Sequence, residues 1–154
     1  MSRLKQLRQV VDQKLLEIAD LDKRKSAYVH LYGVSLAATL ICEKRNLDTE
    51  LVSMAAMLHD LYAYQSGSYE DHAHKSAILA RDILQDLNLT SHKETEAICQ
   101  AIANHDDKDL VHDPLDEALK DADVMHHCFN DLGKAIKDKE AARYQSLRKE
   151  FNLG

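Results

Sequence analysis

The 154 residues contain one proline, four glycines and no tryptophan. β-Sandwiches and β-barrels contain many tight turns and need more glycine and proline than this. No stretch alternates polar and apolar residues for long enough to predict a strand. The sequence therefore predicts an all-α fold, a single compact helical bundle over residues 1–154, which is about the length of one domain.

Cysteine is also scarce, and the three residues Cys42, Cys99 and Cys128 form no C-x-x-C pair. Their odd number and wide spacing exclude a disulfide framework and a thiolate zinc ribbon, and they fit a reducing cytoplasm as the expected location. The N-terminal segment MSRLKQLRQVVDQK is charged throughout and lacks the apolar core of a signal peptide. The longest apolar stretches are too short to span a bilayer, so we expect no membrane partner.

The chain has fewer basic than acidic residues, 20 against 26, and its net charge is -6. A charge of this sign argues against stable, sequence-independent binding to a nucleic-acid backbone or to an anionic membrane. It leaves room for a small phosphorylated substrate, because a metal ion can supply the positive charge at the site itself.

Apolar residues recur at helical spacing along most of the chain. Between Ser26 and Arg45 the repeat predicts one buried helix face, made of Ala27, Leu31, Val34, Ala38 and Ile41. Asp48 is the predicted N-cap of the next helix, LVSMAAMLHDL, which is apolar nearly all round and is expected to run through the core. The YQSGSYED segment that follows is a predicted loop.

Capping residues mark further helix boundaries. A helix is predicted over about residues 72–87, and Ser91 with Glu94 forms a capping box that opens the next one. Asp113 followed by Pro114 is typical of an N-cap and a first helical turn, which predicts another helix there.

Nine histidines stand out in a chain of this size. His59-Asp60 ends the apolar helix, where burial of an imidazole beside a carboxylate is costly unless both groups have partners. A hydrogen-bonded pair at a helix end is one interpretation. A functional site is the other, because three further histidines fall on inward-facing helix positions: His30, His72 and His105.

One carboxylate of the helix after Pro114 also faces inward. With Leu119 and Ala122 at the centre of the buried face, a turn of about 100° per residue places Asp123 just beside that face. The same geometry turns Asp121 toward solvent, so Asp123 is the predicted inward carboxylate.

The order His30, then His59-Asp60, then Asp123 within D-A-D-V resembles the signature of the HD superfamily of metal-dependent phosphohydrolases. The likeness covers about residues 27–132, and the amphipathic segment at about 134–151 follows as a C-terminal helix. The stretches A-A-M-L-H-D, H-A-H-K-S-A, I-A-N-H and K-D-A-D also fit. Together they most resemble the short stand-alone bacterial branch of predicted hydrolases, which implies a single HD-type domain.

This resemblance implies one divalent metal ion held by four ligands: His30, His59, Asp60 and Asp123. A set of imidazoles and carboxylates suits Mn, Fe, Co, Ni or Zn and does not suit Ca. His72 and His105 match extra histidines of the two-metal members, in which Asp60 bridges the ions, so a second and weaker site is left open. The alternatives are an exposed loop histidine for His72 and, for His105, an imidazole that interacts with a helix dipole.

The implied reaction is attack of a metal-activated water on a phosphomonoester or phosphodiester. Asp60 would orient the water, and Lys75, one turn after His72, is the candidate second cation for the phosphoryl oxygens. Glu70 and Asp71 are candidate general acids. The implied substrate is a nucleotide or another small phosphorylated metabolite.

Two features depart from the family pattern. The family commonly has a small residue soon after H-D, as in H-D-I-G, whereas this chain has Tyr62 and Tyr64, which we expect to narrow the pocket or to contact a base. The last aspartate is followed by VMHH in place of arginine, leucine and an acid, and we expect His126 to be a core histidine. Three other histidines are expected at the surface: His74, His92 and His112.

Two other classes of function stay open. The fold can serve as a non-catalytic metal- or nucleotide-binding regulatory protein, and turnover of phosphatase substrates with Mn²⁺ separates this alternative from an enzyme. The chain can also be an all-α interaction module with incidental histidines, which metal analysis of tag-free protein tests. A homodimer is left open as well.

Overall fold

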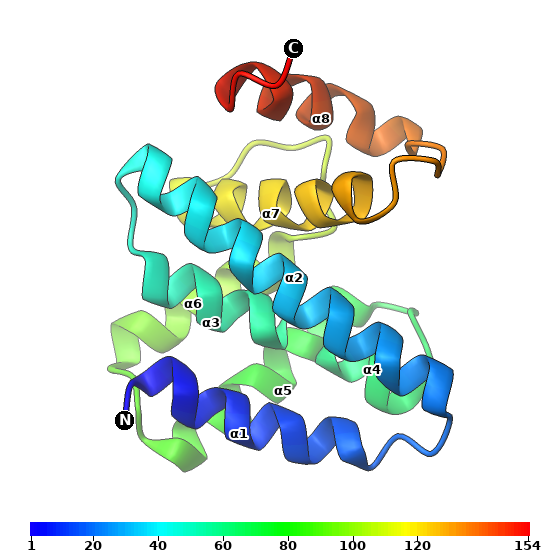
Figure 1. Cartoon of the computed structure of the whole chain (residues 1–154). Coiled ribbons are helices and arrows are strands. Elements are labelled where there is room, and N and C mark those ends of the chain that lie inside the picture. Colours follow the sequence, from blue (N-terminus) through cyan, green and yellow to red (C-terminus); the bar gives the residue numbers. More distant parts are fainter.

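The computed structural model describes residues 1–154 and contains eight helices and no strand, which confirms the all-α fold class. The longest helix, α2 (Leu21–Arg45), crosses the molecule diagonally in Figure 1. In that view α1 (Arg3–Leu16) lies at one end of the molecule and α8 (Asp138–Glu150) at the other. The remaining helices are α3 (Thr49–Leu58), α4 (Leu61–Ser66), α5 (His72–Leu87), α6 (His92–Asn104) and α7 (Pro114–Asn130).

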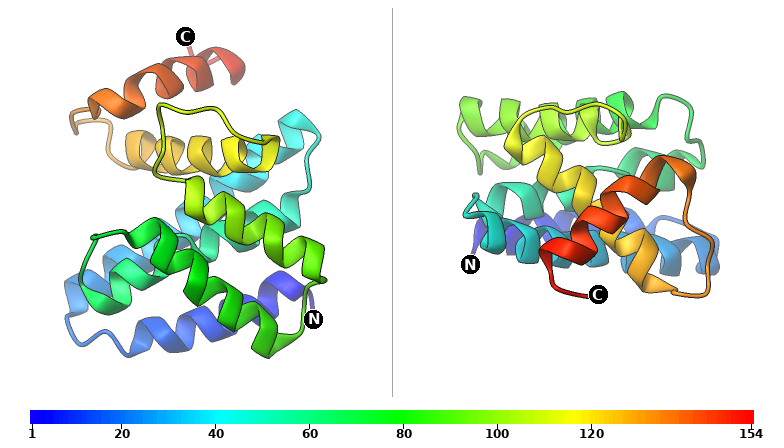
Figure 2. Two further views of the ribbon diagram at one scale, coloured as in Figure 1. Left: turned by 180° about the vertical axis from the view of Figure 1, so that it is seen from behind. Right: turned by 90° about the horizontal axis from the view of Figure 1, so that it is seen from above.

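The centre of the core is formed by α3, as its apolar sequence predicts. Every residue from Leu51 to Leu58 is buried, and the helix contacts α1, α2, α5, α6 and α7. Asp48 caps α3, because its carboxylate accepts a hydrogen bond from the Leu51 amide at 3.0 Å. Figure 2 shows α5 and α6 packed together on the side opposite α2. The end of α3 is therefore enclosed by other helices.

Capping residues set several helix boundaries at the predicted places. The Ser91 hydroxyl accepts a hydrogen bond from the Glu94 amide at 3.2 Å, and the Glu94 carboxylate accepts one from the Ser91 amide at 2.8 Å. The predicted capping box of α6 is therefore confirmed. Asp113 precedes Pro114 at the start of α7, but its carboxylate accepts a hydrogen bond from Gln100 and does not cap the helix.

Three segments differ from the sequence prediction. The helix α1 was not predicted from the sequence. Its buried residues Leu7, Val11 and Leu15 repeat every four residues between charged side chains. The short helix α4 extends to Ser66, into the segment expected to be a loop. The C-terminal helix is shorter than the expected 134–151, because the residues up to its N-cap, Lys137, connect it to α7.

Asp121 is buried, and the expectation that it faces solvent is wrong. Its two carboxylate oxygens accept hydrogen bonds from Arg45 of α2 at 2.7 Å and from Arg143 of α8 at 3.1 Å. The helical geometry of α7 alone turns this residue away from α3, but α8 covers that side of α7. Asp121 therefore joins three helices through charged hydrogen bonds.

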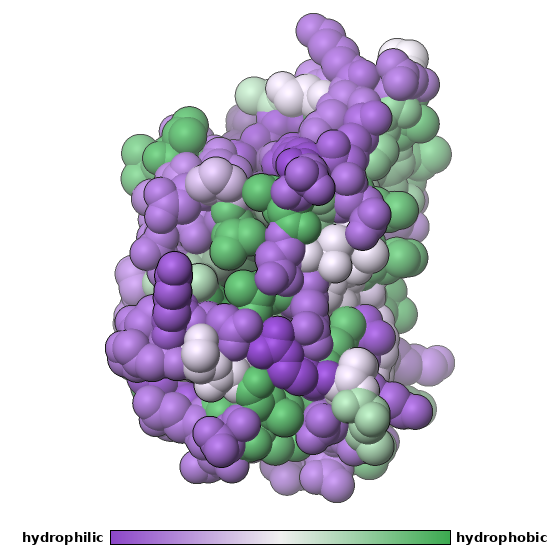
Figure 3. All heavy atoms as spheres, turned by 90° about the vertical axis from the view of Figure 1, so that its left-hand side faces the viewer, coloured by the Kyte–Doolittle hydropathy of each residue, from purple (hydrophilic) through white to green (hydrophobic).

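Hydrophilic side chains cover most of the face drawn in Figure 3, and the apolar ones lie in separate patches between them. Cys42, Cys99 and Cys128 are buried and free, in agreement with the predicted absence of a disulfide framework. None of the helices has the length and apolar character needed to cross a membrane.

Candidate metal centre

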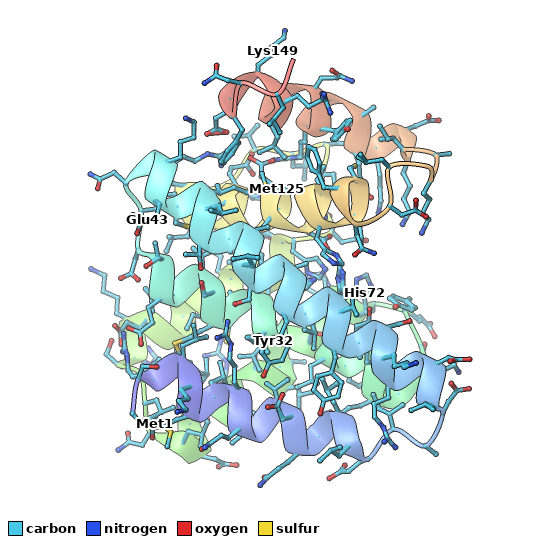
Figure 4. The ribbon with its side chains drawn as sticks, viewed as in Figure 1. Met1, Tyr32, Glu43, His72, Met125 and Lys149 are labelled. Carbon is cyan, nitrogen blue, oxygen red and sulfur yellow. The ribbon has the colours of Figure 1, made fainter.

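The six predicted metal ligands come from different helices and meet at one place. His30 lies inside α2, His59 and Asp60 form the junction between α3 and α4, and His72 begins α5. Of the other two, His105 is the C-cap of α6 and Asp123 lies in α7. Figure 4 shows nitrogen atoms gathered near the labelled His72, between α2 and α7.

Four of these residues form a buried group whose ligand atoms all lie within 4.8 Å of one another: His30, His59, Asp60 and Asp123. Nε2 of His30 lies 3.1 Å from Nε2 of His59 and 3.0 Å from Oδ2 of Asp60. Oδ1 of Asp123 lies 3.3 Å from Nε2 of His30 and 3.4 Å from Nε2 of His59.

The surroundings of two buried carboxylate oxygens show whether this site fits a metal ion. Oδ1 of Asp60 and Oδ1 of Asp123 have no hydrogen-bond partner, although imidazole nitrogens lie within 3.2–3.4 Å of them. The distances are short enough for hydrogen bonds and the angles are unsuitable, so the atoms converge without bonding to one another. Ligands at right angles on an ion with bonds of about 2.1 Å lie about 3 Å apart. The geometry therefore fits a coordination shell.

Main-chain carbonyls orient three of the histidines. Nδ1 of His59 lies 2.6 Å from the Ala56 carbonyl oxygen, and Nδ1 of His105 lies 2.7 Å from that of Ile102. Nδ1 of His72 lies 3.0 Å from the carbonyl oxygen three residues before it. A carbonyl can only accept, so each Nδ1 carries the proton and each Nε2 offers its lone pair to the centre.

Asp60 also belongs to a second group, with His72 and His105. Its Oδ1 lies 3.3 Å from Nε2 of His72 and 3.2 Å from Nε2 of His105, whereas its Oδ2 faces His30 and His59. The two oxygens of one carboxylate therefore face two different sets of histidines. This is the arrangement that a carboxylate bridging two ions requires.

The electrostatics of the site call for a positive charge. Burial would raise the pKa of Asp60 and of Asp123, but neighbouring positive charges and hydrogen bonds hold both well below their usual range. Burial would lower the pKa of His59, and the negative charges of Asp60 and Asp123 close to its ring raise it to about 10. In the metal-free protein the two buried anions are compensated by neighbouring positive charge and hydrogen bonds, and a divalent ion can supply that compensation instead.

The site opens into a cavity of about 390 Å³. Two tyrosines, Tyr64 and Tyr69, are the only hydrophobic residues among the thirteen that line it. Three lysines contribute positive charge to its wall: Lys108, Lys137 and Lys139. The last of these forms an ion pair with Asp106 at 3.0 Å. A cavity of this size and polarity suits a small, charged ligand.

His127 is a further cavity residue. Its ring stacks on that of His30 at 5.0 Å between centroids, and its Nε2 lies 3.6 Å from Oδ1 of Asp123. Nδ1 lies 3.1 Å from each carboxylate oxygen of Glu140, a buried residue in the first turn of α8. The pair joins α7 and α8 at the wall of the cavity.

The sequence analysis missed several cavity residues, chiefly Lys108, His127, Lys137, Lys139 and Glu140. Four of them lie at the end of α7, in the following loop or at the start of α8. Only Lys108 could have been predicted from the sequence as a cavity residue, because it follows His105 by three residues in a short loop.

The structure does not bring Lys75 to the site. Its ammonium nitrogen lies 5.5 Å from the centre of the Tyr62 ring, and neither residue lines the cavity. The side chain leaves α5 toward α4, which the spacing from His72 alone does not reveal. Glu70 is exposed, and Asp71 accepts a hydrogen bond from His74, so neither candidate general acid lies in the cavity.

Of the remaining histidines, two lie at the surface as expected, whereas His112 and His126 differ from the expectations because both are half-buried. His74 and His92 are exposed. His112 is half-buried, with its Nδ1 2.6 Å from Nζ of Lys120, and is therefore not a surface histidine. His126 is half-buried beside His30, at 3.1 Å between the two Nδ1 atoms. Burial, followed by the charges of His30 and His127, lowers the pKa of His126 to about 4.

An all-helical domain around a buried histidine–aspartate cluster is the class of protein that this fold and site define. The chain belongs to the HD domain family, whose model matches residues 27–127. In structure it is similar to a predicted HD superfamily hydrolase from an uncultured Thermotogales bacterium, with a TM-score of 0.66 and 18% sequence identity. That match covers 99% of this chain and 91% of the other. A search of curated proteins gave no match.

Proposed function

We propose that this protein is a metal-dependent phosphohydrolase that cleaves a phosphomonoester or phosphodiester of a nucleotide or another small phosphorylated metabolite. The observation that carries the proposal is a buried histidine–aspartate group that opens into a polar cavity with lysines on its wall. Membership of the HD domain family and likeness to a predicted HD superfamily hydrolase support it.

The donor set suits a divalent transition metal such as Mn, Fe, Co, Ni or Zn. The first ion would be held by His30, His59, Asp60 and Asp123. A second, weaker site would be formed by Asp60, His72 and His105. When bound, such an ion lowers the pKa of a coordinated water to about 7 and polarises a phosphoryl oxygen.

The chain supplies the remaining parts of the mechanism. Asp60 lies between the two sets of histidines, where its carboxylate can accept a hydrogen bond from the attacking water and orient it. Lys137 and Lys139 line the cavity and can bind the phosphoryl oxygens as cations. They take the role that the sequence analysis gave to Lys75.

Protonation of the leaving group is assigned to His127. Its Nε2 faces the cavity side of Asp123, and Glu140 holds the ring through Nδ1. A proton donor held by a carboxylate and close to the reacting phosphorus is what departure of an alkoxide requires.

The test is phosphate release from a panel of nucleoside monophosphates, aryl phosphates and aryl phosphodiesters by tag-free protein with Mn²⁺. We expect turnover that is abolished by a chelator and by His59→Ala, and that is kept by His92→Ala, which alters an exposed histidine outside the cavity lining. Metal-loaded protein that binds a nucleotide without releasing phosphate would overturn the proposal in favour of a regulatory binding protein.

A further inference from the structure

His30 is the one candidate metal-ligating histidine whose Nδ1 has no main-chain carbonyl as its hydrogen-bond partner. His59 and His105 are C-caps, and His72 begins a helix, so the Nδ1 of each reaches the carbonyl oxygen of the residue three before it. His30 lies ten residues into α2, where carbonyl oxygens are occupied by the hydrogen bonds of the helix. Its Nδ1 therefore needs a side chain as partner.

His126 of α7 provides that partner. The two Nδ1 atoms are 3.1 Å apart, and the rings meet edge to face at 5.1 Å between centroids. No other hydrogen-bond partner of Nδ1 of His30 is present in the structure. A metal ion on Nε2 leaves the proton of neutral His30 on Nδ1, so Nδ1 of His126 is the acceptor and its own proton lies on Nε2.

The position of His126 depends on a glycine. A Cβ atom at Gly33, one turn after His30 on α2, would lie 2.2 Å from Cδ2 and 2.4 Å from Nε2 of the His126 ring. Atoms of an imidazole cannot be that close to a methyl group, so only glycine leaves room for the ring between α2 and α7. Gly33 and His126 therefore fit as a pair behind His30.

We propose that His126 is a positioning residue that accepts a hydrogen bond from Nδ1 of His30 and so directs Nε2 of His30 at the first metal ion. It does for a mid-helix ligand what main-chain carbonyls do for His59, His72 and His105. Groups that orient a metal-ligating histidine affect metal affinity directly, by about 10–100-fold. The inference rests on the metal centre of the proposed function, and metal binding rather than turnover is its test.

The experiment measures Co²⁺ affinity of metal-free protein and the visible absorption of the Co²⁺ complex, which reports ligand geometry. We expect His126→Phe, which keeps a ring and removes the acceptor, to weaken Co²⁺ binding by about 10–100-fold and to change the spectrum. His126→Asn places an oxygen near the position of Nδ1 and should restore both. His126→Leu is a second variant without an acceptor, and circular dichroism establishes that each variant is folded.

His112→Phe is the matched control, because His112 is also half-buried and hydrogen-bonded, but its partner is Lys120 and not a candidate metal ligand. It should bind Co²⁺ as the wild type does. Unchanged Co²⁺ affinity and spectrum in folded His126→Phe and His126→Leu would overturn the inference, and so would an Asn variant as weak as the Phe variant. Wild-type protein that binds Co²⁺ without hydrolysing phosphate esters contradicts the proposed function alone.

Discussion

Nζ of Lys108 donates a hydrogen bond to Oδ2 of Asp123 at 2.8 Å, so only the other carboxylate oxygen faces the histidines of the first site. Both side chains are buried, at 2% and 5% exposure. The ammonium group also donates to the His105 carbonyl at 2.6 Å. Lys108 thus compensates the charge of Asp123 while the site holds no cation.

We therefore expect Lys108→Met to lower the free energy of unfolding of the metal-free protein by about 3–5 kcal/mol, because a buried carboxylate loses its partner. Added Mn²⁺ can replace the missing charge, so it should raise the melting temperature of the variant by more than that of the wild type. Thermal and denaturant unfolding with and without Mn²⁺ measure both effects.

Lys120→Met is the control for this prediction. Lys120 is also fully buried, but it donates to the Leu110 carbonyl and pairs with Glu117 instead of a candidate ligand. Its loss should destabilise the protein and leave the Mn²⁺-induced shift at the wild-type value. An equal shift in Lys108→Met and in the wild type would refute the role given to Lys108.

The two aspartates of K-D-A-D should respond differently to replacement by asparagine. Asp123→Asn should lose the first metal ion, because an uncharged amide replaces an anionic ligand. Asp121→Asn should keep the metal and lose about 1.5–3 kcal/mol of stability, because its carboxylate accepts charged hydrogen bonds from Arg45 and Arg143. Metal content and denaturant unfolding of both variants provide the check, and metal loss in Asp121→Asn alone would contradict the structure.

His72→Ala and His105→Ala should each retain the first ion, because neither residue belongs to its ligand group. Both should lose the second ion and most phosphatase activity at low Mn²⁺, with partial recovery at high Mn²⁺. Titration of bound Mn²⁺ together with phosphate release measures this. Normal turnover of both variants at low Mn²⁺ would mean that the centre holds a single ion.

Helical periodicity was sufficient to place the residues that now face one another. His30 and Asp123 lie beside apolar stripes of long helices, and His59-Asp60 ends a helix that has no polar face. At these positions the burial of the neighbouring apolar residues determines which way the side chain points. The structure brings them together as a group that could hold an ion, and their role as ligands stays a prediction.

Helical periodicity does not predict how the loops and α8 pack against the other helices. Lys137 and Glu140 reach the cavity because α8 packs on α7, a contact that charged sequence does not specify. The same contact buries Asp121, which helical geometry alone turns outward. The prediction that Lys75 lies at the site is wrong for a related reason, because the direction of a long side chain depends on neighbours such as Tyr62.

The most direct test of the account is elemental analysis of protein purified without a histidine tag. The arrangement of His30, His59, Asp60 and Asp123 predicts about one tightly bound transition-metal ion per chain in the wild type and almost none in His59→Ala. Equal metal content in the two proteins would contradict it.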